Sequence, residues 1–141
     1  KSVNLQTALP DAAVLIDGDP AQLSQAVANL IDNAIKYTPR DGHVRVALES
    51  EPALIRLTVA DTGIGIPEDE HALVCHRLYR SRNARAETGL GLGMSIVNTS
   101  IESHGKTIAV IVAVRKEVFY PRRITKVPDI TRARWRWRWR R

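Results

Sequence analysis

Three short stretches of the sequence contain residue types that could bind a phosphorylated ligand. In the first, Asn29, Asn33 and Lys36 are separated by four and three residues, and Tyr37 follows directly. On a helix these spacings place the residues on one stripe, with two amide oxygens one turn apart beside a lysine. Amide oxygens can hold a hard cation, a lysine can meet phosphate charge, and an aromatic ring can stack on a base. Polar residues on an ordinary helix surface would give the same pattern, so this stretch alone leaves both interpretations open.

The second stretch, Asp61-Thr62-Gly63-Ile64-Gly65, directly follows an apolar run. Its glycines permit a close approach of backbone and ligand, and the Asp61 carboxylate can accept a hydrogen bond from an exocyclic amine. A tight turn with a helix cap would use the same residue types. Taken by itself, the loop does not separate these two interpretations.

The third stretch, Gly89-Leu90-Gly91-Leu92-Gly93, immediately precedes a predicted helix over residues 94–104. Glycine-rich backbone that leads into a helix can bind phosphate through free N–H groups and the helix dipole. The pattern is not a dinucleotide-binding fingerprint, because no strand feeds it within a βαβ unit, and the sequence has no GxxxxGK[ST] loop. A phosphate-binding turn is therefore one hypothesis for this stretch.

Periodicity predicts the elements that must position these stretches. A long helix begins at Pro20, after the N-cap Asp19, and ends before Thr38-Pro39, because apolar residues repeat between them at three- and four-residue spacing. Residues 75–93 show little periodicity and are expected to form a mobile segment. The other expected elements are strands over residues 2–9, 12–17, 43–49, 54–60 and 107–114, a weaker strand over 118–120, and a second helix over 94–104 that stops at Gly105.

Composition separates an acidic domain from a basic tail. The 141 residues carry a net charge of +6, with 10 Lys and Arg against 13 Asp and Glu in residues 1–110, and 11 against 2 in residues 111–141. The positive excess therefore belongs to the tail and does not mark the domain as a nucleic-acid binder. The single cysteine excludes an internal disulfide framework and a multi-cysteine zinc site. No apolar run reaches the roughly 20 residues that span a bilayer.

The tail ends in the strictly alternating sequence RWRWRWRR, residues 134–141. In an extended chain its three tryptophans share one face and its arginines the other, a pattern that could bind an anionic membrane or nucleic acid. A terminus without a selected function is the alternative. We expect residues 115–141 to form a divergent basic tail that is disordered or partly ordered.

Taken together and in order, the three stretches resemble the ATP-binding catalytic domain of sensor histidine kinases, in the superfamily that also holds gyrase, Hsp90 and MutL. The resemblance rests on QLSQAVANLIDNAIKYTP (22–39), VADTGIGIPED (59–69) and GLGLGMSIV (89–97). It implies an α/β (α+β) two-layer sandwich over residues 1–114, in which a mixed β-sheet has helices packed on one face. This is the Bergerat-type ATP-binding fold.

The resemblance also implies roles for residues of the long helix. Asn33 would bind Mg²⁺, and Asn29 would support the same metal site. Lys36 would face the phosphates and Tyr37 the adenine. ATP and Mg²⁺ are thus the expected ligands.

The two loops would complete this site. Asp61 would bind the adenine amino group, and Gly63, Ile64 and Gly65 would shape the floor of the pocket. Residues 75–93 would be the ATP lid, from which Arg77 or Arg80 would reach the γ-phosphate. The residues expected to hinge the lid and lie near the phosphates are Gly89, Leu90, Gly91, Leu92 and Gly93.

Asn29 distinguishes two branches of the superfamily. The ATPase members place a glutamate at this position as the general base for water, and an amide cannot take up that proton. The residue therefore favours phosphoryl transfer to a histidine. None of the four histidines lies in a phosphoacceptor helix pattern, so the acceptor would belong to a dimerisation domain absent from this chain, with a response regulator as an indirect partner. We expect a cytoplasmic domain of a bacterial inner-membrane sensor kinase that is inactive in isolation.

The predicted lid departs from the family. The usual pattern F-x-R-F-Y-R is replaced by Cys75-His76-Arg77-Leu78-Tyr79-Arg80, in which two positions keep apolar character but lose their aromatic rings. Lys106 stands where a second glycine usually follows His-Gly. These departures leave an alternative: a degenerate nucleotide-binding or regulatory remnant whose Arg/Trp tail binds membrane or nucleic acid.

Overall fold

The structure, a computed structural model, describes residues 2–52, 54–104, 108–114 and 117–119. Two single-turn 3-10 helices, η1 (Glu68–Glu70) and η2 (Arg82–Ala84), lie in the chain between the third strand and the second α-helix. The other elements are β1 (Asn4–Ala8), α1 (Pro20–Tyr37), β2 (His43–Glu51), β3 (Leu54–Asp61), α2 (Gly93–Ser103), β4 (Ile108–Val114) and β5 (Glu117–Phe119). No helix among the described residues is long and apolar enough to cross a membrane.

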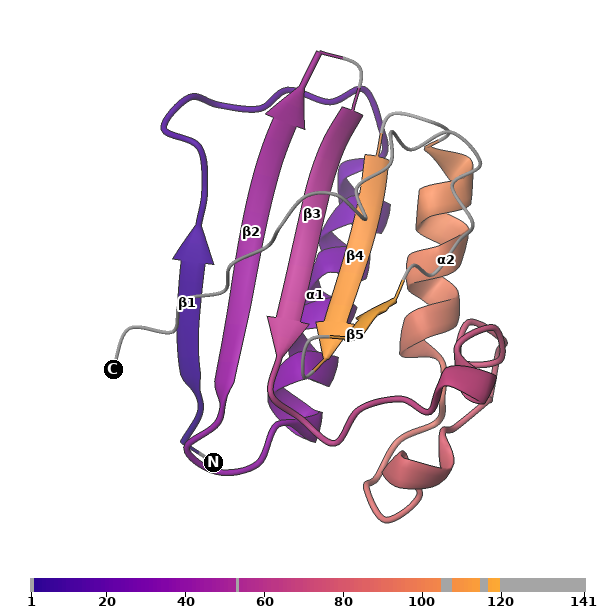
Figure 1. Cartoon of the computed structure of the whole chain (residues 1–141). Coiled ribbons are helices and arrows are strands. Elements are labelled where there is room, and N and C mark those ends of the chain that lie inside the picture. The colour runs from indigo at the N-terminus through magenta and orange to yellow at the C-terminus, as the bar shows by residue number, and fades with distance from the viewer. Residues whose placement is uncertain (1, 53, 105–107, 115–116, 120–141) are drawn as a thin grey trace.

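The strands form one mixed sheet in the order β1-β2-β3-β4-β5. β1 pairs with β2, and β3 with β4, in parallel, whereas β2–β3 and β4–β5 are antiparallel pairs. Figure 1 shows α1 crossing behind the sheet, with α2 beside it on the same side. The expected architecture, a mixed sheet with helices on one face, is confirmed.

The core lies between the two helices and the face of β2 and β3 that they cover. In β2 the buried residues alternate, since side chains on a strand point to opposite faces in turn, whereas in β3 the last six residues, Arg56 to Asp61, are all buried. Each helix contributes residues spaced by four, which lie on one side of the helix. The buried members are Ala26, Leu30 and Ala34 of α1, Val44 and Val46 of β2, Leu57 and Val59 of β3, and Val97 and Ile101 of α2.

The long helix begins and ends where the sequence predicts. The Asp19 carboxylate accepts hydrogen bonds from the N–H groups of Ala21, at 2.8 Å, and Gln22, at 3.2 Å. These bonds lower the pKa of Asp19, with the Gln22 N–H as the largest cause. The Asp19 N–H donates to Nε2 of His104 at 2.8 Å. The start of α1 is therefore bound to the end of α2.

The strand expected over residues 12–17 is wrong. The segment begins with a bend at Ala12 and continues as irregular backbone that connects β1 to α1, and it pairs with no strand among the described residues. Leu15, in its middle, is 90% exposed. The other expected strands and helices are confirmed, with ends that differ by at most two residues. The Gly105 stop signal, Lys106 and the Arg/Trp end of the tail lie outside the described residues.

Removing a core side chain of α2 tests the packing of the two helices. Ile101→Ala should lower the free energy of unfolding by about 2–5 kcal/mol, because it leaves a cavity where a 6% exposed side chain now packs. Urea unfolding measures this loss. Thr99→Ala, at an exposed position of the same helix, should change stability by less than about 0.5 kcal/mol. Equal losses in both variants would contradict the helix placement.

Candidate functional site

A cavity of about 350 Å³ lies between the C-terminal half of α1, the end of β3 and the segment that contains η2. It brings together residues of all three sequence stretches, which are far apart in the chain. The expected residues that line it are Asn33, Lys36, Tyr37, Asp61, Ile64, Gly65, Arg80, Gly89, Leu90, Gly91, Leu92 and Gly93. Asn29, Gly63 and Arg77 are expected residues that do not line it.

The two asparagines of α1 meet the first residue of α2. A Cβ added to Gly93 would lie 3.2 Å from Nδ2 of Asn33 and 3.5 Å from Oδ1 of Asn29. The Asn29 Nδ2 atom is buried and has no hydrogen-bond partner among the described residues. This corner therefore offers two amide oxygens and an unused N–H donor beside the start of a helix.

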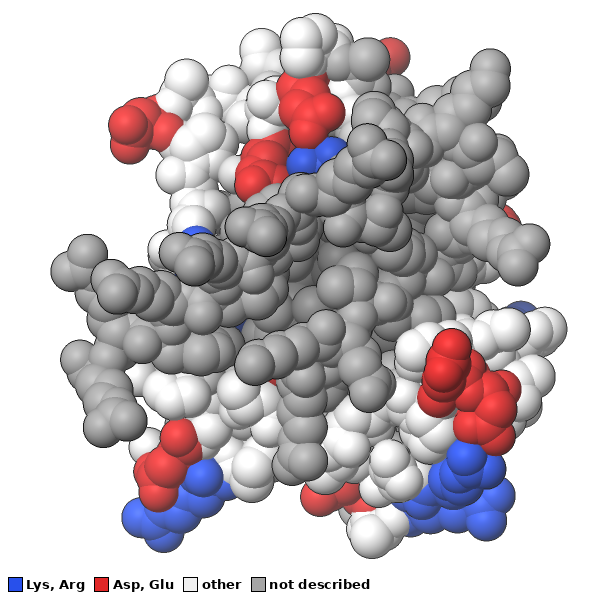
Figure 2. Space-filling model, in the orientation of Figure 1, with Lys and Arg blue, Asp and Glu red and all other residues white. Residues whose placement is uncertain are grey.

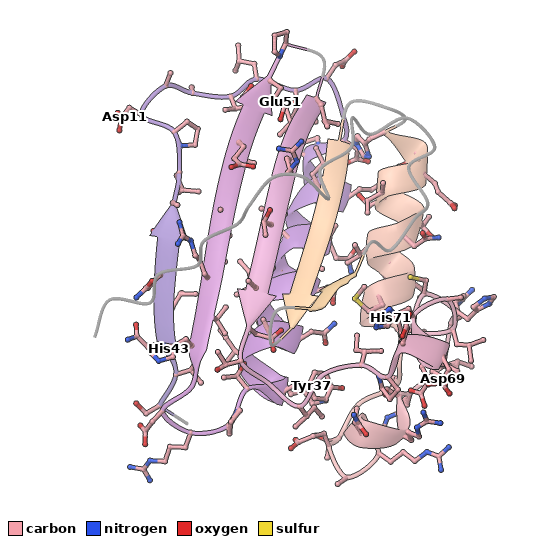
Figure 3. All side chains as sticks on the ribbon, viewed as in Figure 1. Asp11, Tyr37, His43, Glu51, Asp69 and His71 are labelled. Atoms are coloured by element: carbon pink, nitrogen blue, oxygen red, sulfur yellow. The ribbon has the colours of Figure 1, made fainter. Side chains whose placement is uncertain are left out.

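Lys36 and Tyr37 end the same helix at the mouth of the cavity. Nζ of Lys36 is 5.1 Å from the centre of the Tyr37 ring, within the range of a cation–π contact. Figure 3 shows Tyr37 at the lower end of the molecule, on the same side as Asp69 and His71. Both residues are half-buried and line the cavity, as the sequence predicts.

Asp61 is a buried carboxylate at the end of β3. It is 8% exposed, and its Oδ1 accepts the Gly63 N–H at 2.7 Å. Burial raises the pKa of Asp61 to about 6, and the bond from Gly63 opposes that increase. No other hydrogen bond reaches this carboxylate from the described residues. One oxygen of the carboxylate is therefore left for a donor from a ligand.

Gly63 lets the loop after β3 approach α1 closely. A Cβ at this position would lie 2.6 Å from the Tyr37 carbonyl oxygen and 2.6 Å from Oδ1 of Asp61. The Ile64 N–H donates to the same Tyr37 oxygen at 3.2 Å. Although Gly63 does not line the cavity, it fixes the carboxylate and the loop in place.

Of the two arginines of the expected lid, Arg80 lines the cavity and Arg77 does not. Nη2 of Arg80 donates to the carbonyl oxygens of Ala84, at 2.8 Å, and Arg85, at 3.3 Å, and also to that of Glu87. Arg77 instead lines a separate cavity between the first turns of α1 and α2. Of the two candidate arginines, only Arg80 lies where a ligand of the described cavity could reach it.

The two positions at which the lid departs from the family pattern differ in burial. Cys75 is half-buried and packs against the core, as expected for a small apolar residue, and burial raises the pKa of its thiol. Leu78 is 69% exposed and has a positive φ of 65°. Its N–H donates to the Gly91 oxygen at 3.0 Å, which ties the two ends of the lid together.

Sequence reasoning missed the apolar wall and two polar members of the cavity. Tyr79 and Ser81 flank Arg80 in the chain and line the cavity with it. Their position beside a predicted arginine was the available signal. The missed apolar residues are Leu30, Ala34, Val59, Ile66, Val74, Ala84 and Met94.

Residues 18–131 match the family model described as histidine kinase-, DNA gyrase B-, and HSP90-like ATPase. The matched range covers more than half of the chain and includes every residue of the cavity. The chain belongs to this family of ATP-binding domains.

Similar proteins are sensor histidine kinases. The chain is 48% identical over 94 residues to the signal transduction histidine-protein kinase/phosphatase MprB of Mycolicibacterium paratuberculosis. The matched stretch covers 66% of this chain and 18% of that protein. A solved structure of a mycobacterial sensor histidine kinase MprB has a TM-score of 0.64 and 34% identity, over 73% of this chain and 65% of that one. Full-length ShkA in complex with AMPPNP has a TM-score of 0.57 and 25% identity, over 71% and 21%. The chain thus spans about a fifth of the curated relatives it matches.

The raised pKa of Asp61 predicts a pH-dependent stability. The folded carboxyl titrates at about 6 and the unfolded one at its ordinary value of 3.8, so between these values the folded state binds more protons. Stability therefore falls as the pH rises through this window and is constant above it. The free energy of unfolding of Asp61→Asn, measured by urea unfolding, should therefore rise relative to that of wild type by about 3 kcal/mol as the pH increases from about 4 to about 7. Asp11→Asn, at an exposed position, serves as control, and parallel profiles for all three proteins would disprove the burial effect.

Proposed function

We propose that this chain binds Mg-ATP in the described cavity and is the catalytic domain of a sensor histidine kinase. One observation carries the proposal: a buried carboxylate at one side of the cavity and two helix asparagines beside Gly93 at another. We assign residues 1–114 to this domain. We place it on the cytoplasmic side of a bacterial inner-membrane sensor kinase; the relatives are bacterial signal transduction histidine-protein kinases by name, which supports the kinase and the bacterial source alone.

Asp61 suits the adenine end of the ligand. With Oδ1 held by the Gly63 N–H, the carboxylate can accept a further hydrogen bond from the exocyclic amine. The apolar wall, which includes Val59 and Ile66, and the neighbouring Tyr37 ring give the base a water-poor surface. An adenine amino group thus satisfies a carboxylate that burial leaves short of partners.

The phosphate end suits Asn29, Asn33 and the start of α2. The amide oxygens are hard donors that suit Mg²⁺, and the orphaned Nδ2 of Asn29 shows that this corner has unused hydrogen-bonding capacity. Mg²⁺ bound there would neutralise phosphate charge during transfer. Lys36 and the free N–H groups at the start of α2 add positive potential on the same side.

Asn29 favours phosphoryl transfer over hydrolysis, because its amide cannot take a proton from water. The attacking group is then the imidazole nitrogen of a histidine on a separate dimerisation domain. The P–N bond forms as the bond from the γ-phosphorus to the bridging oxygen breaks, and ADP leaves. A response regulator would receive the phosphoryl group afterwards. The similarity of the chain to histidine-protein kinases supports this assignment.

Nucleotide binding is tested by titrating the chain with Mg-ATP. Asn33→Ala and Asp61→Ala should each weaken binding by roughly 10–100-fold, because each loses a contact made to a charged group. Asn98→Ala and Asp11→Ala are matched controls that lie outside the cavity and should bind within about twofold of wild type. Unchanged affinity in both site variants would reject the assignment of the site.

Phosphoryl transfer is tested by mixing the chain with a purified phosphoacceptor domain and labelled ATP. Label should appear on the acceptor histidine with wild type, and Asn33→Ala should reduce the rate by at least about tenfold. An acceptor whose histidine is replaced by alanine is the control. Binding of ATP without any transfer would favour the degenerate remnant instead.

A further inference from the structure

Glu70 of η1 carries a buried charge outside the cavity. Its side chain is 5% exposed, whereas that of the preceding residue, Asp69, is 66% exposed. A carboxylate is placed in such surroundings at a high free-energy cost unless partners compensate it. The contacts of Glu70 with its polar partners therefore indicate its role.

The described polar partners of this carboxylate come from the short segment 79–82. The Arg82 N–H donates to Oε2 at 3.2 Å, and Nε of Arg82 lies 3.3 Å from Oε1. Burial raises the pKa of the Tyr79 hydroxyl, and the charge of the neighbouring Glu70 raises it further. Glu70 thus binds the Arg82 end of this segment directly and lies close to Tyr79 at its other end.

Glu70 also binds the first residue of η2, a turn that the side chain of Ser81 leaves uncapped. This serine occupies the N-cap position of η2, but its side chain makes no capping hydrogen bond, and its hydroxyl is buried without a partner among the described residues. The N–H of Arg82, the first residue of η2, is bonded to Glu70 instead. The turn is therefore positioned from across the loop and not by its own cap.

The held segment forms one wall of the cavity. Tyr79, Arg80 and Ser81 line it in succession, while Glu70 does not. We propose that Glu70 is a positioning residue that fixes this wall against the nucleotide, an inference that rests on the proposed function. Figure 2 shows acidic and basic side chains side by side at the lower right of this face. The exposed Asp69 pairs with the same Arg82 at 2.7 Å. That exposed pair supplies a matched control.

Variants of this 141-residue chain separate the role of the buried carboxylate of Glu70 from that of the exposed carboxylate of Asp69. Glu70→Gln keeps the size of the side chain but removes its charge and turns an NH₂ toward the donors of Arg82. It should speed amide hydrogen exchange at residues 79–84 and weaken Mg-ATP binding, each by roughly tenfold. Asp69→Asn removes an exposed partner of the same arginine and should change both by less than about twofold. Arg82→Gln, which keeps the buried carboxylate and the backbone donor, should give an intermediate effect even if Glu70→Gln fails to fold.

Each outcome decides the role of Glu70. Faster exchange with unchanged affinity would make it a stabilising residue only and overturn the proposal, as would equal effects of Glu70→Gln and Asp69→Asn. If wild type and Glu70→Gln bind Mg-ATP with equal affinity, this inference is overturned but the proposed function stands. Wild type that binds no Mg-ATP overturns the proposed function, and this inference with it.

Discussion

The packing of α1 on the sheet is the constraint on which the rest of the structure depends. The buried stripe of Ala26, Leu30 and Ala34 fixes the rotation of the helix about its own axis. Once that rotation is set, the neighbouring stripe that carries Asn33 faces the end of β3 and the start of α2. The packing of the hydrophobic core therefore determines the direction in which the polar side chains of α1 point.

The sequence predicted the elements that combine local signals with regular periodicity. Asp19 and Pro20 marked the start of α1, and alternation marked the strands of the β2–β3 hairpin, because caps and strand periods depend on neighbouring residues alone. Residues 12–17 misled because their apolar content is typical of a strand, whereas a strand also needs a partner in space. Leu15 is apolar but lies exposed in the segment that connects β1 to α1, where no neighbouring strand pairs with it among the described residues.

The site was also predicted only in part, because local motifs can be recognised in the sequence whereas contacts between distant loops cannot. Residues that the family motif contains, such as Asn33 and Asp61, line the cavity as expected. The ion pair between the buried Glu70 and the exposed Arg82 was not predicted, because it joins two loops whose approach depends on the tertiary fold. Charged residues in the sequence of a loop are usually solvated, so nothing local sets Glu70 apart from its exposed neighbours Glu68 and Asp69.

The hydrogen bond between the two helices also defines the chemistry of one histidine. The Ser100 carbonyl oxygen, 2.7 Å from Nδ1 of His104, can only accept, so Nδ1 carries the proton. Nε2 must then use its lone pair to accept the Asp19 N–H. Both ring nitrogens are committed to joining the helices, and neither has an electron pair available to attack phosphorus. If the chain transfers a phosphoryl group to imidazole as proposed above, this imidazole has no free nitrogen lone pair with which to receive it.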